Sequence, residues 1–432
     1  MARGKKKEEL TLEEKLERAL VPVEEQPYEV PENWCWCKLE LLTNIKTGDK
    51  DANYGCEDGK YYFFTCASEP IRCSDFSFEG KAILLAGNGD IGNISLYNGK
   101  FEAYQRTYVL QQCRGLIEEY LYYNFKYRWI DYNKDKMFGS AIPYIRLGNL
   151  KEYEVPIPPL QEQQRIVDRI ESLFAKLDEA KEKVQFVRNC CDDDFSSVVH
   201  EALTGNLTEE WRVQNGLSRD GWKKSKLGNL GSLERGRSKH RPRNDPRLFG
   251  GSYPFIQTGD VAEADVYIEK HKQTLSEFGL AQSRMFSKGT LCITIAANIG
   301  DVAILSYDCC FPDSVVGFTP CKDVESKYIY YMMSELQKEI EANAPATAQK
   351  NINLKILNDI DIIIPSVIEQ REIIAILDDL YDKKRQVKEK TEQIVDAIDM
   401  MKKSILTKAF RGELGTNNPE EESAIKLLKK YL

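Results

Sequence analysis

Hydrophobic residues recur every three and four positions along two stretches of the chain, and this pattern predicts two long helices. The first stretch begins at Ile157 and the second at Ile364, and they align without a gap at an offset of 207 residues. Of the 51 aligned pairs, 15 are identical, which indicates an internal repeat. At 1.5 Å per residue, a helix over Leu160–Leu203 would be roughly 65 Å long.

The spacing inside each stretch is that of a heptad, which predicts that one helix packs along the other. The polar seam residues Asp194, Lys384 and Thr391 are expected to fix the register. A proline precedes each helix, and Gly205 and Gly412 follow as C-cap glycines. Two unrelated core helices, the alternative, would not share an offset and end signals. The predicted apolar seam is Ile166, Ile170, Leu173, Leu177, Ala180, Val184, Val187, Cys191 and Val198, then Ile373, Leu377, Leu380, Val387, Ile394, Ile398, Met401 and Ile405.

A globular sequence precedes each predicted helix. In the first, apolar runs at 61–65, 82–86 and 108–110 predict strands between Gly- and Asn-rich turns, followed by a helix over 116–129. The pattern recurs from Trp222. Residues 34–39 correspond to 222–227, Gly48 to Gly236, 84–92 to 293–300, and 120–123 to 328–331. The globular sequences have diverged further than the helices, which favours variable domains on a fixed scaffold.

Amphipathic segments flank this duplicated part. Residues 8–20 predict a short helix with Thr11 and Glu14 in capping-box spacing, and three prolines then predict an extended linker. Residues 421–432 predict a final helix. The predicted organisation is an N-terminal helix and linker (1–26), a first domain (27–155), a long helix (156–207), a linker (208–221), a second domain (222–361), a second long helix (362–414) and a C-terminal helix (415–432).

Composition is that of a water-soluble globular protein, with 42% hydrophobic and 30% charged residues. No stretch is apolar enough to span a membrane, and the charged N-terminus has no apolar signal-peptide core, so we expect a cytoplasmic protein. The net charge of −8 argues against a generic polyanion binder. Twelve cysteines without a Cys-x-x-Cys pair, together with three histidines, predict reduced thiols and no metal site.

Catalytic motifs are missing from the sequence. Residues 87–92 match G-x-G-x-x-G, but a strand-like run follows where the dinucleotide fold needs a helix, so a glycine turn is favoured. We find no phosphate loop, no Asn/Asp-Pro-Pro-aromatic motif of an amino-methyltransferase, and no locally supported Ser-His-Asp or Cys-His set. The sequence therefore predicts a protein without catalysis of its own.

Residues 235–247 form a basic loop that is interrupted by Gly and Pro and carries six arginines and lysines. Such a loop can contact phosphates, while arginine or asparagine can recognise a base edge. A solvated mobile loop is the alternative. A second polar stretch, 347–351, precedes the second long helix, and its counterpart by the repeat is 140–144.

Two variable globular sequences, each followed by a near-copy of a Pro-Pro-Leu-x-Glu-Gln helix, resemble the specificity subunit of type I restriction–modification enzymes. Residues 27–34 are similar to that family's lead-in to its first recognition domain, 203–212 to its central linker, 409–414 to its C-terminal signature and 347–352 to the segment that closes a recognition domain. The first domain departs at 140–144, where the Thr-x-Gln-x-Asn pattern is missing.

The resemblance implies an α+β fold, in which two mixed α/β target recognition domains are separated by two long antiparallel coiled-coil helices with pseudo-twofold repetition. It implies a non-catalytic subunit whose domains each recognise half of a split double-stranded DNA target. The helices would set the spacer and dock two methyltransferase subunits, with restriction–translocase subunits joining for cleavage. S-adenosylmethionine, ATP and magnesium would belong to those partners, with no cofactor in this chain.

Particular residues are expected to carry these contacts. The expected helix residues for partner docking are Glu162, Gln163, Leu173, Glu369, Gln370 and Leu380. The expected DNA contacts are Lys46, Asn53, Tyr54, Asn88, Arg106, Ser140, Arg235, Arg237, Lys239, Arg241, Arg243, Gln257, Thr258, Asn298, Thr347, Gln349 and Asn351.

Two other function classes stay open at this point. One is a single-chain nuclease or methyltransferase with an unfamiliar site, which the missing motifs disfavour. The other is a coiled-coil adaptor unrelated to DNA, which the duplicated domains with basic and Asn/Gln-rich loops disfavour.

Overall fold

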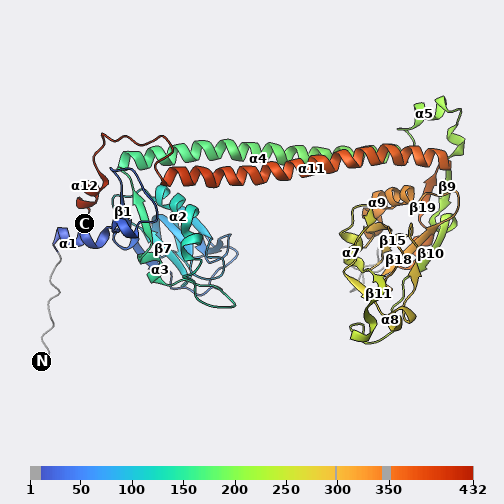
Figure 1. Ribbon diagram of the computed structural model, residues 1–432, viewed down its shortest axis with the longest axis horizontal. Coiled ribbons are helices and arrows are strands. Elements are labelled where there is room, and N and C mark those ends of the chain that lie inside the picture. Colours follow the sequence, from blue (N-terminus) through green and yellow to red (C-terminus); the bar gives the residue numbers. More distant parts are fainter. Residues whose placement is uncertain (1–10, 297–298, 343–351, 432) are drawn as a thin grey trace. The chain divides into compact units, whose positions relative to one another are not determined.

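The computed structural model describes residues 11–296, 299–342 and 352–431, and the chain divides into two compact units (Figure 1). Residues 1–184 and 393–432 form the first unit, and residues 185–392 form the second. Each contains a mixed α/β domain and part of both long helices, α4 (Leu160–Leu203) and α11 (Val367–Phe410). Helix α4 spans Leu160–Leu203, the residues over which the sequence predicted the first long helix.

The first unit contains a six-stranded sheet in the order β2-β7-β5-β6-β3-β4. All its pairings are antiparallel except that of β3 with β6. The three predicted strands correspond to β3, β5 and β7. The strands are β2 (Asn44–Thr47), β3 (Tyr61–Phe64), β4 (Ile71–Cys73), β5 (Phe78–Ala86), β6 (Ile94–Ala103) and β7 (Thr107–Gln111).

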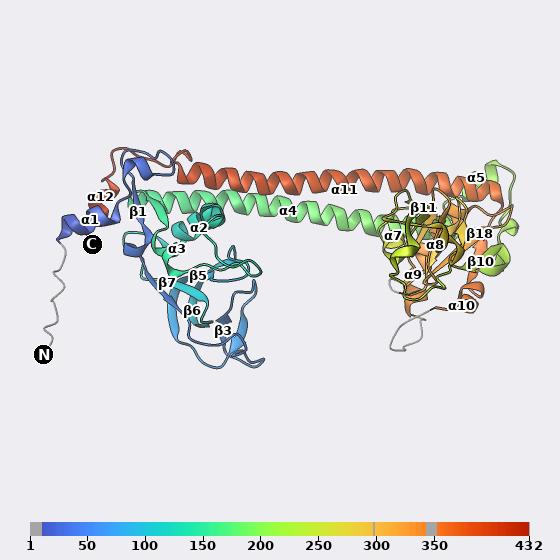
Figure 2. The same cartoon turned by 60° about the horizontal axis from the view of Figure 1, so that its bottom comes forward.

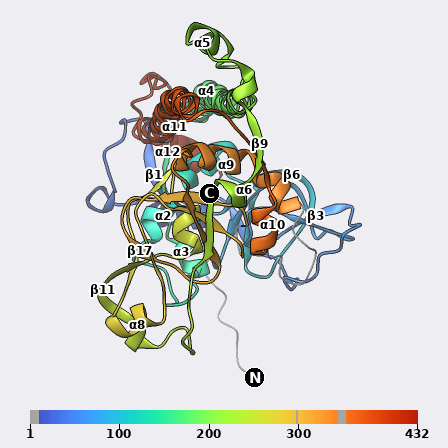
Figure 3. The ribbon, with the colours of Figure 1, turned by 90° about the vertical axis from the view of Figure 1, so that its right-hand side faces the viewer.

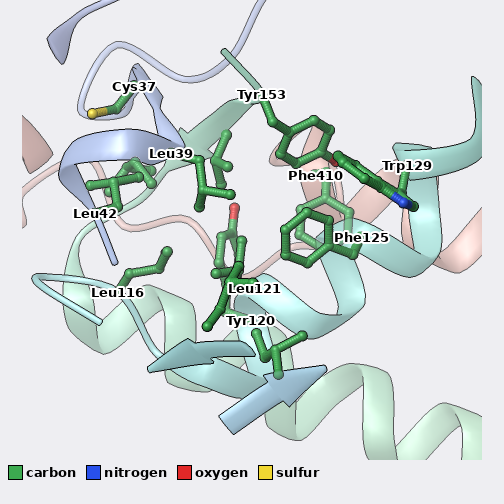
Figure 4. Packing of buried hydrophobic residues seen from close by; sticks show 14 of the residues in the cluster. Cys37, Leu39, Leu42, Leu116, Tyr120, Leu121, Phe125, Trp129, Tyr153 and Phe410 are labelled. Atoms are coloured by element: carbon green, nitrogen blue, oxygen red, sulfur yellow. The ribbon is translucent and has the colours of Figure 1, made fainter. Parts of the chain in front are cut away.

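Helix α2 (Glu118–Asn133) lies between this sheet and α4 (Figure 2). Its Tyr123 ring contacts Phe174 of α4 with ring centroids 5.9 Å apart. Helix α2 also contributes to a buried aromatic cluster, where Phe125 stacks on Tyr153 and Tyr120 meets Phe410 of α11 edge-on (Figure 4). The core of the first domain is therefore continuous with both long helices.

The second unit contains a five-stranded sheet, β10-β18-β15-β16-β12, and a four-stranded sheet, β13-β11-β17-β14. Helix α9 (Ser326–Ala342) packs on the larger sheet and on α11 through Tyr328, Ile329 and Met333, as α2 does in the first unit. The strands are β10 (Gly231–Arg235), β11 (Phe249–Phe255), β12 (Tyr267–Ile268), β13 (Gln273–Leu275), β14 (Met285–Phe286), β15 (Leu291–Thr294), β16 (Val302–Leu305), β17 (Cys309–Cys310) and β18 (Val315–Pro320). Short helices complete it: α6 (Leu227–Leu230), α7 (Thr258–Ala262), α8 (Glu277–Ala281), α10 (Leu354–Asn358) and the 3-10 turns η3 (Arg219–Gly221) and η4 (Pro246–Leu248).

The repeat holds at the level of single hydrogen bonds. Each domain closes with its first strand antiparallel to the strand before the long helix: β1 (Cys35–Lys38) with β8 (Glu154–Ile157), and β9 (Lys223–Lys226) with β19 (Asp361–Ile364). The Tyr120 hydroxyl donates to the Pro156 carbonyl at 2.8 Å. The Tyr328 hydroxyl donates to the Ile363 carbonyl at 2.8 Å, and positions 156 and 363 are 207 residues apart. The internal repeat predicted from the sequence is confirmed.

The long helices pair antiparallel in each unit, and Figure 3 shows them end-on as two adjacent coils. In the first unit Asp178 pairs with Lys402 and Lys181 with Asp399, so numbers rise on one helix as they fall on the other. The second unit has the same order, with Arg188 paired to Glu392 and Asp192 to Lys384. Lys384 thus acts between the helices, as its place in the seam predicted, while Asp194 is exposed.

The predicted seam is wrong at three positions. Ile394 and Met401 of α11 keep 45% and 50% of their surface exposed, and Val187 of α4 keeps 46%. In this part of α11, the predicted seam residue Ile398 is buried, and Lys402, which the heptad leaves out of the seam, has its ammonium 5.1 Å from the centre of the Phe174 ring. An α-helix drifts by about 20° per heptad against an exact 3.5-residue repeat, so a strict heptad does not follow the contact line.

The ends of the chain depart slightly from the expectations. Helix α1 (Leu12–Ala19) has the predicted capping box between Thr11 and Glu14, and it packs beside α12 (Ala424–Lys429) in the first unit. The linkers are more structured than expected, because they contain η1 (Val23–Glu25) and α5 (Glu209–Gln214). Helix α2 begins and ends later than predicted, and η2 (Leu39–Leu41) and α3 (Leu147–Lys151) were not anticipated.

Candidate nucleic-acid interface

Loops from four parts of the first domain meet at one end of its large sheet. The Gly87 amide donates to the Arg106 carbonyl at 2.8 Å, and the Gly89 amide donates to the Pro143 carbonyl at 2.9 Å. The Gln105 amide donates to the Lys50 carbonyl at 2.9 Å. The predicted DNA contacts of this domain all lie on these loops or at the adjoining end of β2. They are Lys46, Asn53, Arg106 and Ser140, which are exposed, and Tyr54 and Asn88, which are half-buried.

The glycine-rich segment 87–92 belongs to this loop end. It connects β5 to β6, which pair as an antiparallel hairpin, so a strand and no helix follows it. This confirms the glycine turn that the sequence favoured over a dinucleotide-binding motif.

The basic loop of the second domain lies across an equivalent loop end. The Gly236 amide donates to the Val315 carbonyl at 2.9 Å, the Arg237 amide to the Phe311 carbonyl at 3.1 Å and the Lys239 amide to the Gln282 carbonyl at 3.2 Å. Both ends of the segment 311–315 are therefore bonded to the start of the basic loop. A cavity of about 160 Å³ beside it is lined by three of the predicted DNA contacts, Arg237, Arg243 and Gln257.

The cations of the basic loop are not equivalent. Arg243 donates to both oxygens of Asp313 at 2.9 and 3.0 Å, and Arg241 donates to the Ser238 and His240 carbonyls at 2.7 and 2.8 Å. Arg235 donates to the Asp313 carbonyl. Arg237 and Lys239 are exposed and have no ion pair to any described residue. These two side chains are the ones free to meet phosphates.

Replacing both Arg237 and Lys239 with alanine is expected to weaken DNA binding about equally for all sequences. The slope of log affinity against log salt should fall by about one for each lost phosphate contact. Fluorescence anisotropy of the chain with labelled duplex DNA over a salt series measures this slope. Lys224→Ala on β9, an exposed lysine paired with Asp361, is the matched control. A double variant with the wild-type slope would exclude the two residues from the interface.

The other predicted contacts of the second domain fall into two groups. Gln257 is exposed and donates to the Gln273 side-chain carbonyl at 2.8 Å, and Thr258 begins α7. Asn298, Thr347, Gln349 and Asn351 lie outside the described residues.

The start of each long helix carries a buried polar cluster. Glu162 accepts from the Trp34 indole at 2.8 Å and from the Asn417 amide at 2.9 Å. Burial raises the pKa of Glu162 above its ordinary value, while these donors lower it. The side-chain carbonyl of Gln163 accepts from the Ile117 amide, and its NH2 group donates to the Gly115 and Pro158 carbonyls. Neither Glu162 nor Gln163 has exposed surface.

The second cluster repeats the Trp–Glu contact of the first, but Glu369 has different further partners. Glu369 accepts from the Trp222 indole at 3.0 Å, as Glu162 does from Trp34, but it also pairs with Arg212 and accepts from the Thr208 hydroxyl at 2.7 Å. Gln370 donates to the Asp323 and Pro365 carbonyls at 3.1 and 3.0 Å. The tryptophans and Arg212 were missed from the sequence, although the repeat places both tryptophans at matching positions.

These clusters correct the expectation for partner docking. Glu162, Gln163, Glu369 and Gln370 are used inside the chain, where each joins a helix start to its own domain, so their side chains do not present a surface. Leu173 and Leu380 are half-buried on the helices.

The described residues hold no group of three or more His, Cys, Asp or Glu side chains arranged to bind a metal ion. The twelve cysteines form no disulfide with one another. Among the described helices, none is long and apolar enough to cross a membrane.

Comparison with known proteins assigns the chain to a family. The family model described as type I restriction modification DNA specificity domain matches residues 31–185 and again residues 219–395, which together are more than half of the chain.

The chain belongs to this type I specificity family.

Members of the type I specificity family align over two thirds or more of the chain. The EcoDI specificity subunit of Escherichia coli is 29% identical over 435 residues, covering 93% of this chain and 95% of that protein. The EcoKI specificity subunit of E. coli K12 is 25% identical over 68% of this chain and 66% of that protein.

Solved structures of the type I specificity family share the fold. A chain from a study of complex assembly and conformational transition in the type I R-M system matches with a TM-score of 0.70 at 20% identity, covering 90% of this chain and all of that one. The HsdS subunit from Thermoanaerobacter tengcongensis matches with a TM-score of 0.52 at 20% identity, covering 91% of this chain and all of that one. The predicted fold class of two mixed α/β domains with two long helices is confirmed.

Proposed function

We propose that this chain is the non-catalytic DNA specificity subunit of a type I restriction–modification complex, in which each domain recognises one half of a bipartite target. The observation that carries the proposal is the duplicated architecture. Two different loop ends are each mounted on a long helix through the same strand pairing, tyrosine bond and buried Trp–Glu contact. Duplicated mounting with different loops is what two separate half-sites require. The proposal that the ligand is DNA rests on membership of the type I DNA specificity family.

The long helices are proposed to set the length of unrecognised sequence between the half-sites. A 44-residue helix is roughly 66 Å long at 1.5 Å per residue, which is close to two turns of B-DNA at about 34 Å each. This length allows two domains to contact the same face of the duplex. The antiparallel ion pairs between the helices keep their register fixed in each unit.

The helices are also proposed to dock the modification subunits, which would bring S-adenosylmethionine, while restriction subunits would bring ATP and magnesium. The exposed apolar side chains on the helices support this. Ile394 and Met401 are seven residues apart on one face of α11, and Met400, the sequence neighbour of Met401, keeps 65% of its surface exposed. Contiguous exposed apolar surface is typical of protein interfaces, and these side chains would contribute to such a surface. We therefore propose Ile394, Met400 and Met401 as docking residues.

Replacing Met400 and Met401 together with lysine is expected to abolish co-purification of the modification subunit, because two charges would be buried without partners in the interface. Pull-down and analytical size exclusion measure this. The control is Lys403→Glu, an exposed residue of the same helix, and circular dichroism checks that both variants keep wild-type helicity. A double variant that still binds would remove this face from the proposal.

Selection of bound duplexes from a random pool tests the DNA proposal. The chain in complex with its modification subunit should enrich a split motif with two defined halves. A complex that assembles yet enriches no sequence would instead favour the protein-interaction adaptor.

A further inference from the structure

Each domain has a tight turn at its loop end, and the two turns are held by the same kind of backbone hydrogen bonds. In the first domain it is residues 104–107 and in the second 312–315; we refer to them as the paired turns. The Gly48 amide donates to the Thr107 carbonyl at 3.3 Å, and the Gly236 amide donates to the Val315 carbonyl at 2.9 Å. Within each turn the last amide donates to the first carbonyl, Thr107 to Tyr104 at 2.8 Å and Val315 to Pro312 at 3.1 Å, so the two turns have the same backbone bonds although their sequences differ.

Two further contacts fix this equivalence. A Cβ atom on Gly48 would lie 1.7 Å from the Ala103 carbonyl oxygen, and one on Gly236 would lie 2.2 Å from the Pro312 carbonyl oxygen. Only glycine allows so close an approach. The Arg106 carbonyl accepts from the Gly87 amide, and the Ser314 carbonyl accepts from the Ile295 amide at 3.0 Å. Each paired turn is therefore held from both sides by backbone bonds.

The second residue of each paired turn is of a different type in the two domains, but in both it contacts a side chain from the loop that follows the packed glycine. In the first domain it is Gln105, whose side-chain NH2 group donates to Asp51 at 2.9 Å. In the second it is Asp313, which accepts from Arg243 through both oxygens. Asp51 and Arg243 both lie in the loop that begins at the packed glycine. The same turn therefore carries the Gln105–Asp51 pair in the first domain and the Asp313–Arg243 pair in the second.

Exposure argues that these pairs are not there for stability. The side chains of Arg243 and Asp313 keep 55% and 35% of their surface, and Gln105 and Asp51 are exposed. Ion pairs this exposed add little to the free energy of unfolding. A guanidinium held by a carboxylate nevertheless has fewer conformations, and its contacts to Asp313 use only Nη2. Nε and Nη1 stay available for a ligand, and the rigid turn fixes their direction.

The residue types match the base edges of the DNA major groove. Arginine donates to O6 and N7 of guanine, aspartate accepts from N4 of cytosine, and glutamine pairs with N6 and N7 of adenine. We infer that Arg243 and Asp313 together recognise one G·C base pair in one half-site, and that Gln105, oriented by Asp51, recognises an A·T pair at the equivalent place in the other. This inference rests on the proposed function and names the specificity-determining residues within it.

The test is mapping of methylated sites in cells that express the modification subunit with variants of this chain. Asp313→Asn and Arg243→Ala should both relax the same G·C position, lowering its preference about tenfold or more, as expected for loss of a base contact. The other half-site should be unchanged. Gln105→Ala should relax one A·T position of the other half-site only. Asp361→Asn, an exposed aspartate paired with Lys224 and Lys226, is the matched control and should leave the motif intact.

Arg243→Lys keeps the charge without the planar fork, so it separates recognition from folding. This variant should bind non-cognate DNA with wild-type affinity but should no longer prefer the G·C pair at that position. If the Asp313 and Arg243 variants methylate the wild-type motif, the inference is wrong. It is also wrong if these variants lose methylation equally at all sites while the motif stays unchanged, because the ion pair would then only hold the loop in place. A wild-type chain that yields no split motif overturns the proposed function itself.

Discussion

Arg212→Ala is expected to destabilise the second unit by about 3–5 kcal/mol, because it leaves the Glu369 carboxylate buried without its cation. The two side chains are 4% and 3% exposed. Arg212 also donates to the Gly205 carbonyl at 2.8 Å, so one side chain ties the central linker to the start of α11. Urea unfolding of the purified chain, followed by tryptophan fluorescence, measures the loss.

Glu369→Gln in the Arg212→Ala background should recover part of the lost stability, because a neutral amide is less costly to bury than a carboxylate. Arg371→Ala is the matched control: its pair with Glu325 is 69% and 33% exposed, so it should cost under about 1 kcal/mol. Equal, small effects of Arg212→Ala and Arg371→Ala would mean that the buried cluster does not hold the linker.

A second large effect is expected from lengthening both long helices together. Seven residues inserted after Arg188 in α4 and seven before Glu392 in α11, which face each other across the pair, would add about 10 Å. At 3.4 Å per base pair this corresponds to about three base pairs. The spacer of the preferred target should lengthen by about that amount, while both half-site sequences stay the same.

The insertion in one helix alone serves as its control. It shears the antiparallel pair against its ion pairs and should lower stability without giving a defined new spacer. If the double-insertion variant forms a folded, active complex and its methylated sites keep the original spacer, the helices do not set the spacer length.

The long helices could be predicted closely because their signals are local. The proline before the first turn and Gly205 after the last turn predict where α4 begins and ends. The same bounds, shifted by the repeat offset of 207 residues, are those of α11. The face of each helix was less predictable. The heptad places Ile394, Ile398 and Met401 in the seam, but only Ile398 of these three is buried, and Lys402, outside the heptad, lies against Phe174. Helix geometry and an exact heptad drift apart along the helix.

The polar clusters could not be predicted, because their members are far apart in the sequence. Trp34 and Glu162 are separated by 128 residues, and Arg212 and Glu369 by 157. The Leu-x-Glu-Gln motif was visible, but its side chains were expected to face a partner. Their burial follows from where the strand preceding each helix pairs, and that pairing is fixed only by the folded domain.

The loop ends show the same limit. The basic run 235–247 identified the loop, but it did not distinguish the exposed Arg237 from Arg243, which Asp313 holds from a turn 70 residues away. Gly48 and Gly236 were correctly matched from the sequence. Their shared role, packing on the paired turns, required the structure.

The most direct test of this account is sequencing of methylated sites in cells that carry this chain with its modification subunit. The account predicts one split motif, two defined half-sites separated by a spacer of fixed length, which disappears when this chain is deleted. A continuous motif, or methylation that persists with the same sequence preference in the absence of this chain, would contradict it.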